Sequence, residues 1–221
     1  MIEYASSENT SSSNTVDNNS NTMKRDFITI GVVSRLSYEK NIGFLLTVAS
    51  TLKFQHNIKA KYVIIGDGPA ISDLRHLARS LKVANDTTFL GYLRSAEIAQ
   101  HVSKFDIFFN PTTHTETFCI ANIEAMALGI PVVGFGLQSG SMEYIDDVAA
   151  IGIDLSLPLA SSSSYISSKN IIMDKTLNIL LHLIKDKHKR RRIGKRGKAS
   201  VRRRYIKKYT MEMYERVYDL Y

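Results

Sequence analysis

Cysteine is nearly absent from the sequence, and the single Cys119 excludes a disulfide bond within the chain. Residues 1–25 contain no apolar run of the kind found in secretory signals. No uninterrupted apolar run approaches the roughly 18 residues that a membrane-spanning helix needs. These absences indicate a reducing environment, and we expect the protein to be cytoplasmic.

Acidic residues are scarce in only one part of the chain. The net charge is +8, but residues 185–221 alone carry +11, whereas residues 1–184 carry −3. The basic segment at 185–208 is compatible with a solvated helical face, with contact to an anionic membrane, or with nucleic acid. Nucleic acid is the least favoured of these partners, because no pattern of a nucleic-acid-binding fold accompanies the segment.

Large apolar side chains are also scarce at the start of the chain. The first 22 residues include six Ser, five Asn and three Thr, so we expect residues 1–25 to be disordered. We expect a single domain over residues 26–186, followed by a basic helical segment over residues 187–221. A length of 221 residues suits one domain of ordinary size with appendages.

Strand-like and helical patterns alternate through the predicted domain. The strand-like runs are apolar nearly throughout, which is typical of strands covered on both faces of a sheet. Alternation of strands and helices predicts parallel pairing through right-handed crossovers, and therefore a Rossmann-like doubly wound α/β sheet. The predicted strands are 28–33, 61–66, 87–91, 106–110 and 131–136, and the predicted helices are 42–55, 70–82, 96–104, 118–128 and 170–186.

Two loops at the carboxyl ends of the first strands contain candidate binding residues. Ligands of this fold bind at these ends. In "SRLSYEKN", Arg35 and Lys40 precede a predicted helix and could form an anion site, although a solvated loop fits them equally well. In "GDGP", Gly66 permits a tight turn. A dinucleotide fingerprint would need glycine at position 71, and Ile71 there argues against NAD or FAD.

The loop after the fourth predicted strand, "NPTTHTETF", presents Glu116 just before a helix. The backbone amides of Phe118, Cys119 and Ile120 could hold a diphosphate there. Glu124 follows about two turns later, and for either glutamate alone an exposed helix charge is the better interpretation. Carboxylates repel phosphates, so as a pair their expected partners are neutral hydroxyl groups, such as those of sugars and riboses.

Six segments, taken in order, resemble the C-terminal half of a family 4 glycosyltransferase of the GT-B fold. They are "SRLSYEKN", "VIIGDGP", "FLGYL", "DIFFNPTTHTETF", "NIEAMALGIPVV" and "SVRRRYIKKYTMEMYERVYDLY". The resemblance implies a hexosyltransferase, mannosyltransferases included, that uses a UDP- or GDP-linked sugar. It also implies transfer with retention of the anomeric configuration, with no cofactor and usually no bound metal.

The same resemblance implies roles for individual residues. Arg35 and Lys40 match the diphosphate-binding pair, Glu116 matches the glutamate that holds the donor sugar, and Glu124 matches the one that holds the ribose. The amides of Phe118, Cys119 and Ile120 match the phosphate-binding turn, and Gly66 belongs to the donor-binding set. The catalytic residues implied are Glu116, Arg35 and Lys40.

The sequence departs from this family in two respects. A GT-B enzyme has an N-terminal acceptor domain, and here about 25 polar residues stand in its place. We therefore expect an acceptor domain supplied by another chain, or a protein that binds donor without efficient transfer, or a fragment of a longer enzyme. In addition, Cys119 stands where the family usually has glycine, and its side chain could crowd the phosphates.

Overall fold

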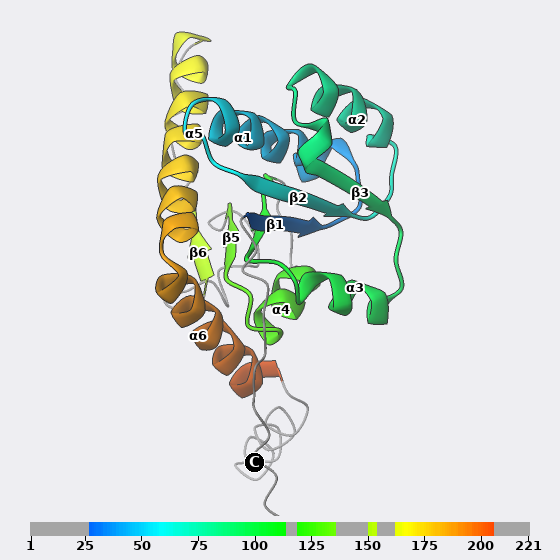
Figure 1. The fold of residues 1–221 in the computed structure, drawn as a ribbon, viewed down its shortest axis with the longest axis vertical. Helices are drawn as coiled ribbons and strands as arrows, with labels where there is room; N and C mark the ends of the chain where they lie inside the picture. Colours follow the sequence, from blue (N-terminus) through cyan, green and yellow to red (C-terminus); the bar gives the residue numbers. More distant parts are fainter. Residues whose placement is uncertain (1–26, 114–118, 136–149, 154–161, 206–221) are drawn as a thin grey trace, which may run out of the picture.

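The computed structural model describes residues 27–113, 119–135, 150–153 and 162–205, which form a parallel sheet with helices on both faces (Figure 1). Six strands follow the order β3-β2-β1-β4-β5-β6, and every neighbouring pair is parallel. This arrangement confirms the predicted Rossmann-like doubly wound fold. The strands are β1 (Ile28–Val33), β2 (Ala60–Ile65), β3 (Thr87–Gly91), β4 (Ile107–Asn110), β5 (Val132–Gly134) and β6 (Ala150–Gly152).

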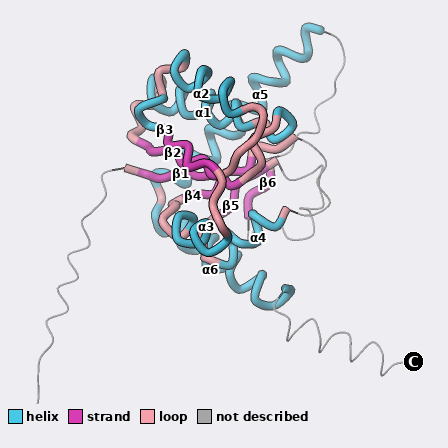
Figure 2. The backbone as a smooth tube through the Cα atoms, turned by 90° about the vertical axis from the view of Figure 1, so that its right-hand side faces the viewer, coloured by secondary structure: helices cyan, strands magenta, loops and turns pink. Residues whose placement is uncertain are grey.

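The helices form two layers around this sheet. Helices α1 and α2 cover one face and α3 and α4 cover the other, while α5 and α6 run along the β6 side; Figure 2 shows the strands between the two layers. The helices are α1 (Ile42–Phe54), α2 (Ile71–Ser80), α3 (Ser95–Val102), α4 (Ile120–Ala127), α5 (Ser162–Lys185) and α6 (Lys187–Tyr205), with short 3-10 turns η1 (Tyr38–Lys40) and η2 (Ala84–Asp86).

The central strands are apolar at most positions, which fits a sheet that is covered on both faces. In β4, Phe108 and Phe109 are both fully buried, yet they belong to different hydrophobic cores. Phe109 packs with residues of α1, α2 and α5, whereas Phe108 packs with residues of α4. Successive side chains of a strand point to opposite faces, so an unbroken apolar run supplies both cores.

The five predicted strands all form, but β6 was not predicted. Ala150–Gly152 is three residues long and lies within an apolar sequence run, 148–153 ("VAAIGI"), that the predicted strands did not include. It pairs with β5 alone, at the edge of the sheet. Helix α5 begins earlier than the predicted 170–186, at Ser162. Leu177, Leu180 and Leu183 of α5 are buried against the core.

One cation of the basic segment, Arg190, has a structural role. Arg190 of α6 is 8% exposed and donates hydrogen bonds to the carbonyls of Leu183 (2.6 Å) and Ile184 (2.9 Å) at the end of α5. Its guanidinium also lies 3.7 Å from a carboxylate oxygen of Asp106. Arg190 therefore joins α5, α6 and the residue before β4, and its charge is already paired within the fold.

Helix α6 packs closely against the end of α4. A Cβ atom at Gly194 would lie 1.9 Å from the carbonyl oxygen of Gly129, so a glycine at position 194 allows the two backbones to approach. Ile193, Ser200 and Val201 are also buried on this side of α6. Within the described residues, no helix is long and apolar enough to cross a membrane.

Candidate functional site

The candidate site lies at the carboxyl ends of the strands, where the strand order reverses. The chain runs outward from β1 through β2 to β3, then returns to place β4 on the other side of β1. In doubly wound folds this reversal leaves a crevice between the loops that follow the two central strands. Here the described parts of those connections are residues 34–41 after β1, and residues 111–113 and 119 after β4.

The two loops are joined by hydrogen bonds between residues far apart in sequence. Asn41 Nδ2 donates to the carbonyl of Pro111 at 3.2 Å, and Thr112 Oγ1 lies 3.4 Å from the carbonyl of Glu39. Asn41 adopts the left-handed conformation, with φ 54°, at the start of α1. The segment that carries Arg35 and Lys40 is therefore held beside the loop that leads to α4.

Gly66 positions the Arg35 loop from the other side. Its φ is +130°, and a Cβ atom there would lie 1.9 Å from the carbonyl oxygen of Ser34. Beside this contact, the amide of Leu36 donates to the carbonyl of Asp67 at 2.9 Å. The structure thus gives a packing reason for glycine at position 66, whereas its predicted contact with a donor stays a prediction.

The predicted cations lie on either side of a buried anchor. Arg35 is exposed, Leu36 is fully buried, and Lys40 is partly buried at the end of η1, where it interacts with a neighbouring group. Burial of Leu36 fixes the path of this loop, because an apolar side chain of that size gains about 2 kcal/mol on leaving water. The two cations are therefore held by a short, ordered segment.

Glu39 is a charged member of this loop that sequence reasoning overlooked. A hydrogen bond from the Ser37 hydroxyl, with smaller effects from the charges of Lys40 and Arg35, holds the pKa of Glu39 below its usual value. The carboxylate is consequently ionised at neutral pH and partly offsets the two cations. Its presence inside "SRLSYEKN" was visible in the sequence, but only the fold places its charge near both Lys40 and Arg35.

Helix α4 begins at Ile120, two residues later than the predicted 118. Cys119 precedes it in an extended conformation, and its side chain makes no capping hydrogen bond among the described residues. The first amides of a helix lack intrahelical partners, so that of Ile120 suits an anion, while the predicted role of the Cys119 amide stays a prediction. Glu116 and Phe118 lie outside the described residues, and their predicted roles stay predictions.

Asn110, at the end of β4, holds the start of α4 through side-chain hydrogen bonds. It is 8% exposed, and its Nδ2 donates to Cys119 Sγ at 3.3 Å and to Asn122 Oδ1 at 3.1 Å. Its Oδ1 accepts a hydrogen bond from the amide of Thr112 at 3.2 Å. The sulfur of Cys119 therefore faces a buried amide, which explains how a residue larger than glycine is accommodated here.

Glu124 lies one helical turn after Ile120 on α4. Both residues are exposed, and positions four apart share one face of a helix. The described residues thus bring Arg35, Lys40, the start of α4 and Glu124 to one edge of the sheet. Because Glu116 is not described, the meeting of all four predicted charges around one ligand stays a prediction.

A cavity of about 490 Å³ adjoins the β1 loop on its α2 side. Its lining includes Tyr38, Asn41 and Asp73, and the Tyr38 hydroxyl donates to a carboxylate oxygen of Asp73 at 2.7 Å. None of the predicted donor-binding residues lines this cavity. Among the described residues there is no cluster of three His, Cys, Asp or Glu side chains that could hold a metal.

The family model described as glycosyl transferases group 1 matches residues 14–200. Among curated proteins, the alpha-monoglucosyldiacylglycerol synthase of Streptococcus pneumoniae is 36% identical over 105 residues, which are 47% of this chain and 23% of that protein. The chain thus matches about a quarter of that relative's length.

Solved structures resemble the described fold over most of its length. Anabaena HepE, crystallised with UDP and glucose, is similar with a TM-score of 0.69 at 22% identity, over 87% of this chain and 48% of that one. The C-terminal domain of a group 1 glycosyl transferase from Francisella tularensis, LpcC, gives a TM-score of 0.63 at 22% identity, over 80% of this chain and 86% of that domain. These likenesses concern the fold.

Proposed function

Because the chain belongs to the glycosyl transferases group 1 family and matches the C-terminal half of GT-B enzymes, we propose that it is the donor-binding half of a retaining hexosyltransferase. Its substrate is then a UDP- or GDP-linked sugar, with mannose among the candidate hexoses. The observation that carries this proposal is the Asn41–Pro111 hydrogen bond, which keeps the cationic β1 loop beside the loop leading to α4.

The diphosphate of the donor would lie between Arg35, Lys40 and the first amides of α4. When the sugar leaves, the bond between its anomeric carbon and the diphosphate breaks, and negative charge grows on the departing oxygen. Cations and oriented amides near that oxygen stabilise the transition state more than the ground state. Asn110 donates a hydrogen bond to the Cys119 sulfur. This contact supports a position of the side chain in which it does not crowd a diphosphate at the start of α4.

The two glutamates would hold the neutral parts of the donor. Glu124 is exposed on α4, one turn from its start, which supports contact with ribose hydroxyls next to the diphosphate. Glu116 would hold hydroxyls of the transferred sugar and so fix the anomeric carbon for attack. No metal or other cofactor enters this proposal.

The acceptor would come from outside the described domain. The chain covers 48% of the length of HepE, and that enzyme was crystallised with both UDP and glucose. We infer that an acceptor domain, in another subunit or in a longer form of this protein, completes the cleft in the cytoplasm. Without it, the chain would bind donor and transfer slowly or not at all.

Calorimetric titration of the full chain with UDP, GDP, UDP-glucose and GDP-mannose tests this function. The double variant Arg35→Gln/Lys40→Gln should weaken binding at least tenfold, since each charge-assisted bond contributes about 1.5 to 3 kcal/mol. The control Arg79→Gln/Lys82→Gln makes the same change in net charge at exposed positions and should have little effect. Absence of saturable binding by the unmodified chain to any of these ligands would refute the proposal.

A transfer assay with and without added membranes separates the two classes of function. Release of UDP or GDP from the donor that depends on membranes or on a second subunit would support a function in sugar transfer. Saturable donor binding without turnover under every condition would favour the alternative, a non-catalytic nucleotide-sugar-binding or regulatory subunit.

A further inference from the structure

Helix α6 has one side that the fold uses and one that it does not. Its 19 residues include 11 Lys and Arg and no Asp or Glu. Ile193, Gly194, Gly197, Ser200 and Val201 form the buried side. The exposed remainder includes Arg196, Ala199 and Arg204 together with six cations that are called the basic face below: Arg191, Arg192, Lys195, Lys198, Arg202 and Arg203.

The basic face is a straight, unbroken row of positive charge. Arg191, Lys195, Lys198 and Arg202 recur at intervals of four, three and four residues, so they share one stripe of the helix. At about 1.5 Å per residue this stripe is roughly 17 Å long. Cations thus occupy the spacing that apolar residues occupy on the buried side of an amphipathic helix.

Folding does not account for this row. The pairs Arg191–Lys195 and Lys198–Arg202 place like charges four residues apart, which destabilises a helix. None of the six side chains forms an ion pair with another residue that the structure describes, unlike Arg190. The first turn of α6 contains no acid, but Asp186, directly before the helix, accepts a hydrogen bond from the amide of Lys189 at 2.8 Å, and its charge acts on that of Arg192. This single carboxylate does not pair the rest of the row. An external anion would relieve these repulsions.

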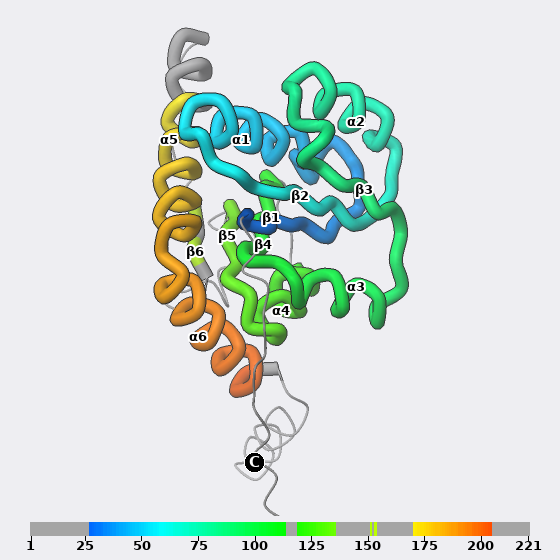
Figure 3. Tube along the Cα trace, viewed as in Figure 1, coloured from blue at the N-terminus to red at the C-terminus, as the bar shows by residue number. Residues whose placement is uncertain are grey.

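We propose that the basic face adsorbs to the anionic lipid headgroups of a bilayer. Helix α6 lies along an outer edge of the body, on the side away from β3 (Figure 3), and the side chains of the basic face are exposed. The basic face contains no aromatic side chain, so it offers no platform on which nucleic-acid bases could stack. It contains no large apolar side chain either, so adsorption is electrostatic and does not involve insertion.

Sedimentation of the full chain with vesicles tests this proposal. The vesicles are phosphatidylcholine alone, or phosphatidylcholine with about one third phosphatidylglycerol, at low salt. Partitioning should require the anionic lipid and should fall steeply between about 0.1 M and 0.5 M salt, because screening shortens the range of the attraction.

Matched variants locate the contact. Arg191→Gln/Lys195→Gln/Arg202→Gln should weaken partitioning at least about tenfold, because each cation near an anionic surface contributes severalfold. The control Lys59→Gln/Arg79→Gln/Lys82→Gln removes three exposed cations elsewhere and should change partitioning less than about twofold. Circular dichroism and thermal unfolding establish that both variants are folded.

Three outcomes would overturn the proposal. They are equal binding to neutral and anionic vesicles, equal losses in the two triple variants, and tighter binding of the basic face to an RNA or DNA duplex than to the anionic vesicles. Membrane adsorption does not depend on sugar transfer. Donor titration of the basic-face variant should therefore match that of the unmodified chain, and either proposal can fail without the other.

Discussion

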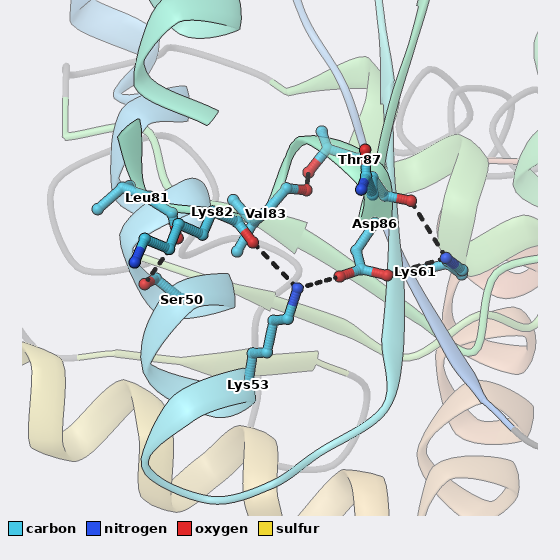
Figure 4. A network of polar contacts seen from close by, with 9 residues as sticks. Ser50, Lys53, Lys61, Leu81, Lys82, Val83, Asp86 and Thr87 are labelled. Carbon is cyan, nitrogen blue, oxygen red and sulfur yellow. Dashed lines mark hydrogen bonds and ion pairs between the residues drawn. The ribbon is translucent and has the colours of Figure 1, made fainter. Parts of the chain in front are cut away.

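Lys53 in α1 and Asp86 in η2 form an ion pair of 2.8 Å, and Lys61 in β2 reaches the other oxygen of the same carboxylate at 2.9 Å (Figure 4). Lys53 also donates to the carbonyl of Lys82 at 3.0 Å. Asp86 directly precedes β3, so these contacts hold the connection into an edge strand against α1 and β2.

Asp86→Asn should destabilise the fold in a pH-dependent way. Hydrogen bonds from Lys53 and Lys61 hold the pKa of Asp86 below its usual value. The stabilisation is therefore present above the unfolded carboxyl pKa of about 3.9 and is lost as the pH falls through the lower folded pKa. The lysine side chains are 38% and 45% exposed, so solvent screening limits the loss to about 1 kcal/mol at pH 7.

Urea unfolding at pH 7 and pH 3 measures this effect. The difference between Asp86→Asn and the unmodified chain should shrink at pH 3. Asp174→Asn, at an exposed position of α5, is the control and should be close to neutral at both pH values. An Asp86→Asn penalty that is equal at pH 7 and pH 3 would contradict the ionic explanation.

Gly66→Ala should destabilise more than Gly91→Ala. Both glycines have positive φ, +130° and +71°, so each substitution carries backbone strain. Only at Gly66 would the new Cβ atom also meet a backbone oxygen, that of Ser34, at 1.9 Å, whereas nothing lies within 4 Å at Gly91. We expect an additional loss of about 1 to 3 kcal/mol for Gly66→Ala in urea unfolding.

The same pair of variants tests how Gly66 affects the site. Displacement of the Ser34 backbone would move the Arg35 loop, so Gly66→Ala should also weaken nucleotide binding in calorimetry. Gly91→Ala leaves that loop in place. Equal nucleotide affinities for the two variants would mean that Gly66 does not position Arg35.

Asn110→Ala should lower both stability and nucleotide affinity. The substitution removes the buried hydrogen bonds to Asn122 and to the amide of Thr112, at a cost of about 1 to 3 kcal/mol. It also releases the start of α4, whose amides are predicted to hold the diphosphate. Asn85→Ala, at an exposed position, is the control. Unchanged nucleotide affinity in folded Asn110→Ala would argue against the α4 amides as the phosphate site.

Much of the fold could be predicted because its strands are buried on both faces. Runs such as 28–33 are apolar at most positions and form full strands, whereas the apolar run 148–153 contains an edge strand of only three residues, so an apolar run alone did not identify β6. The site was harder to predict. The start of α4 depends on a hydrogen bond between Asn110 and Asn122, which belong to different elements, and no local pattern indicates such a bond.

Glu124→Ala and Glu116→Ala should differ in which part of the donor they affect. If Glu124 holds the ribose, its loss weakens binding of UDP or GDP and of their sugars alike, by about tenfold or more. If Glu116 holds the transferred sugar, its loss weakens only the nucleotide sugars. Calorimetry with UDP and UDP-glucose compares the two variants, and equal losses for free UDP would contradict this division.

Gly194→Ala should destabilise the protein, although glycine to alanine usually stabilises the interior of a helix by about 0.5 to 1 kcal/mol. The sign reverses here because the new Cβ atom would lie 1.9 Å from the carbonyl oxygen of Gly129, and both backbones are fixed by packing. Gly43→Ala in α1 is the control, since its Cβ would approach only the flexible end of Leu77, at 3.2 Å. Urea unfolding should show a loss of about 1 to 3 kcal/mol for Gly194→Ala and a near-neutral change for Gly43→Ala. A gain in stability for Gly194→Ala would mean that α6 does not press against the end of α4, and the division of α6 into a buried side and a basic face would fail with it.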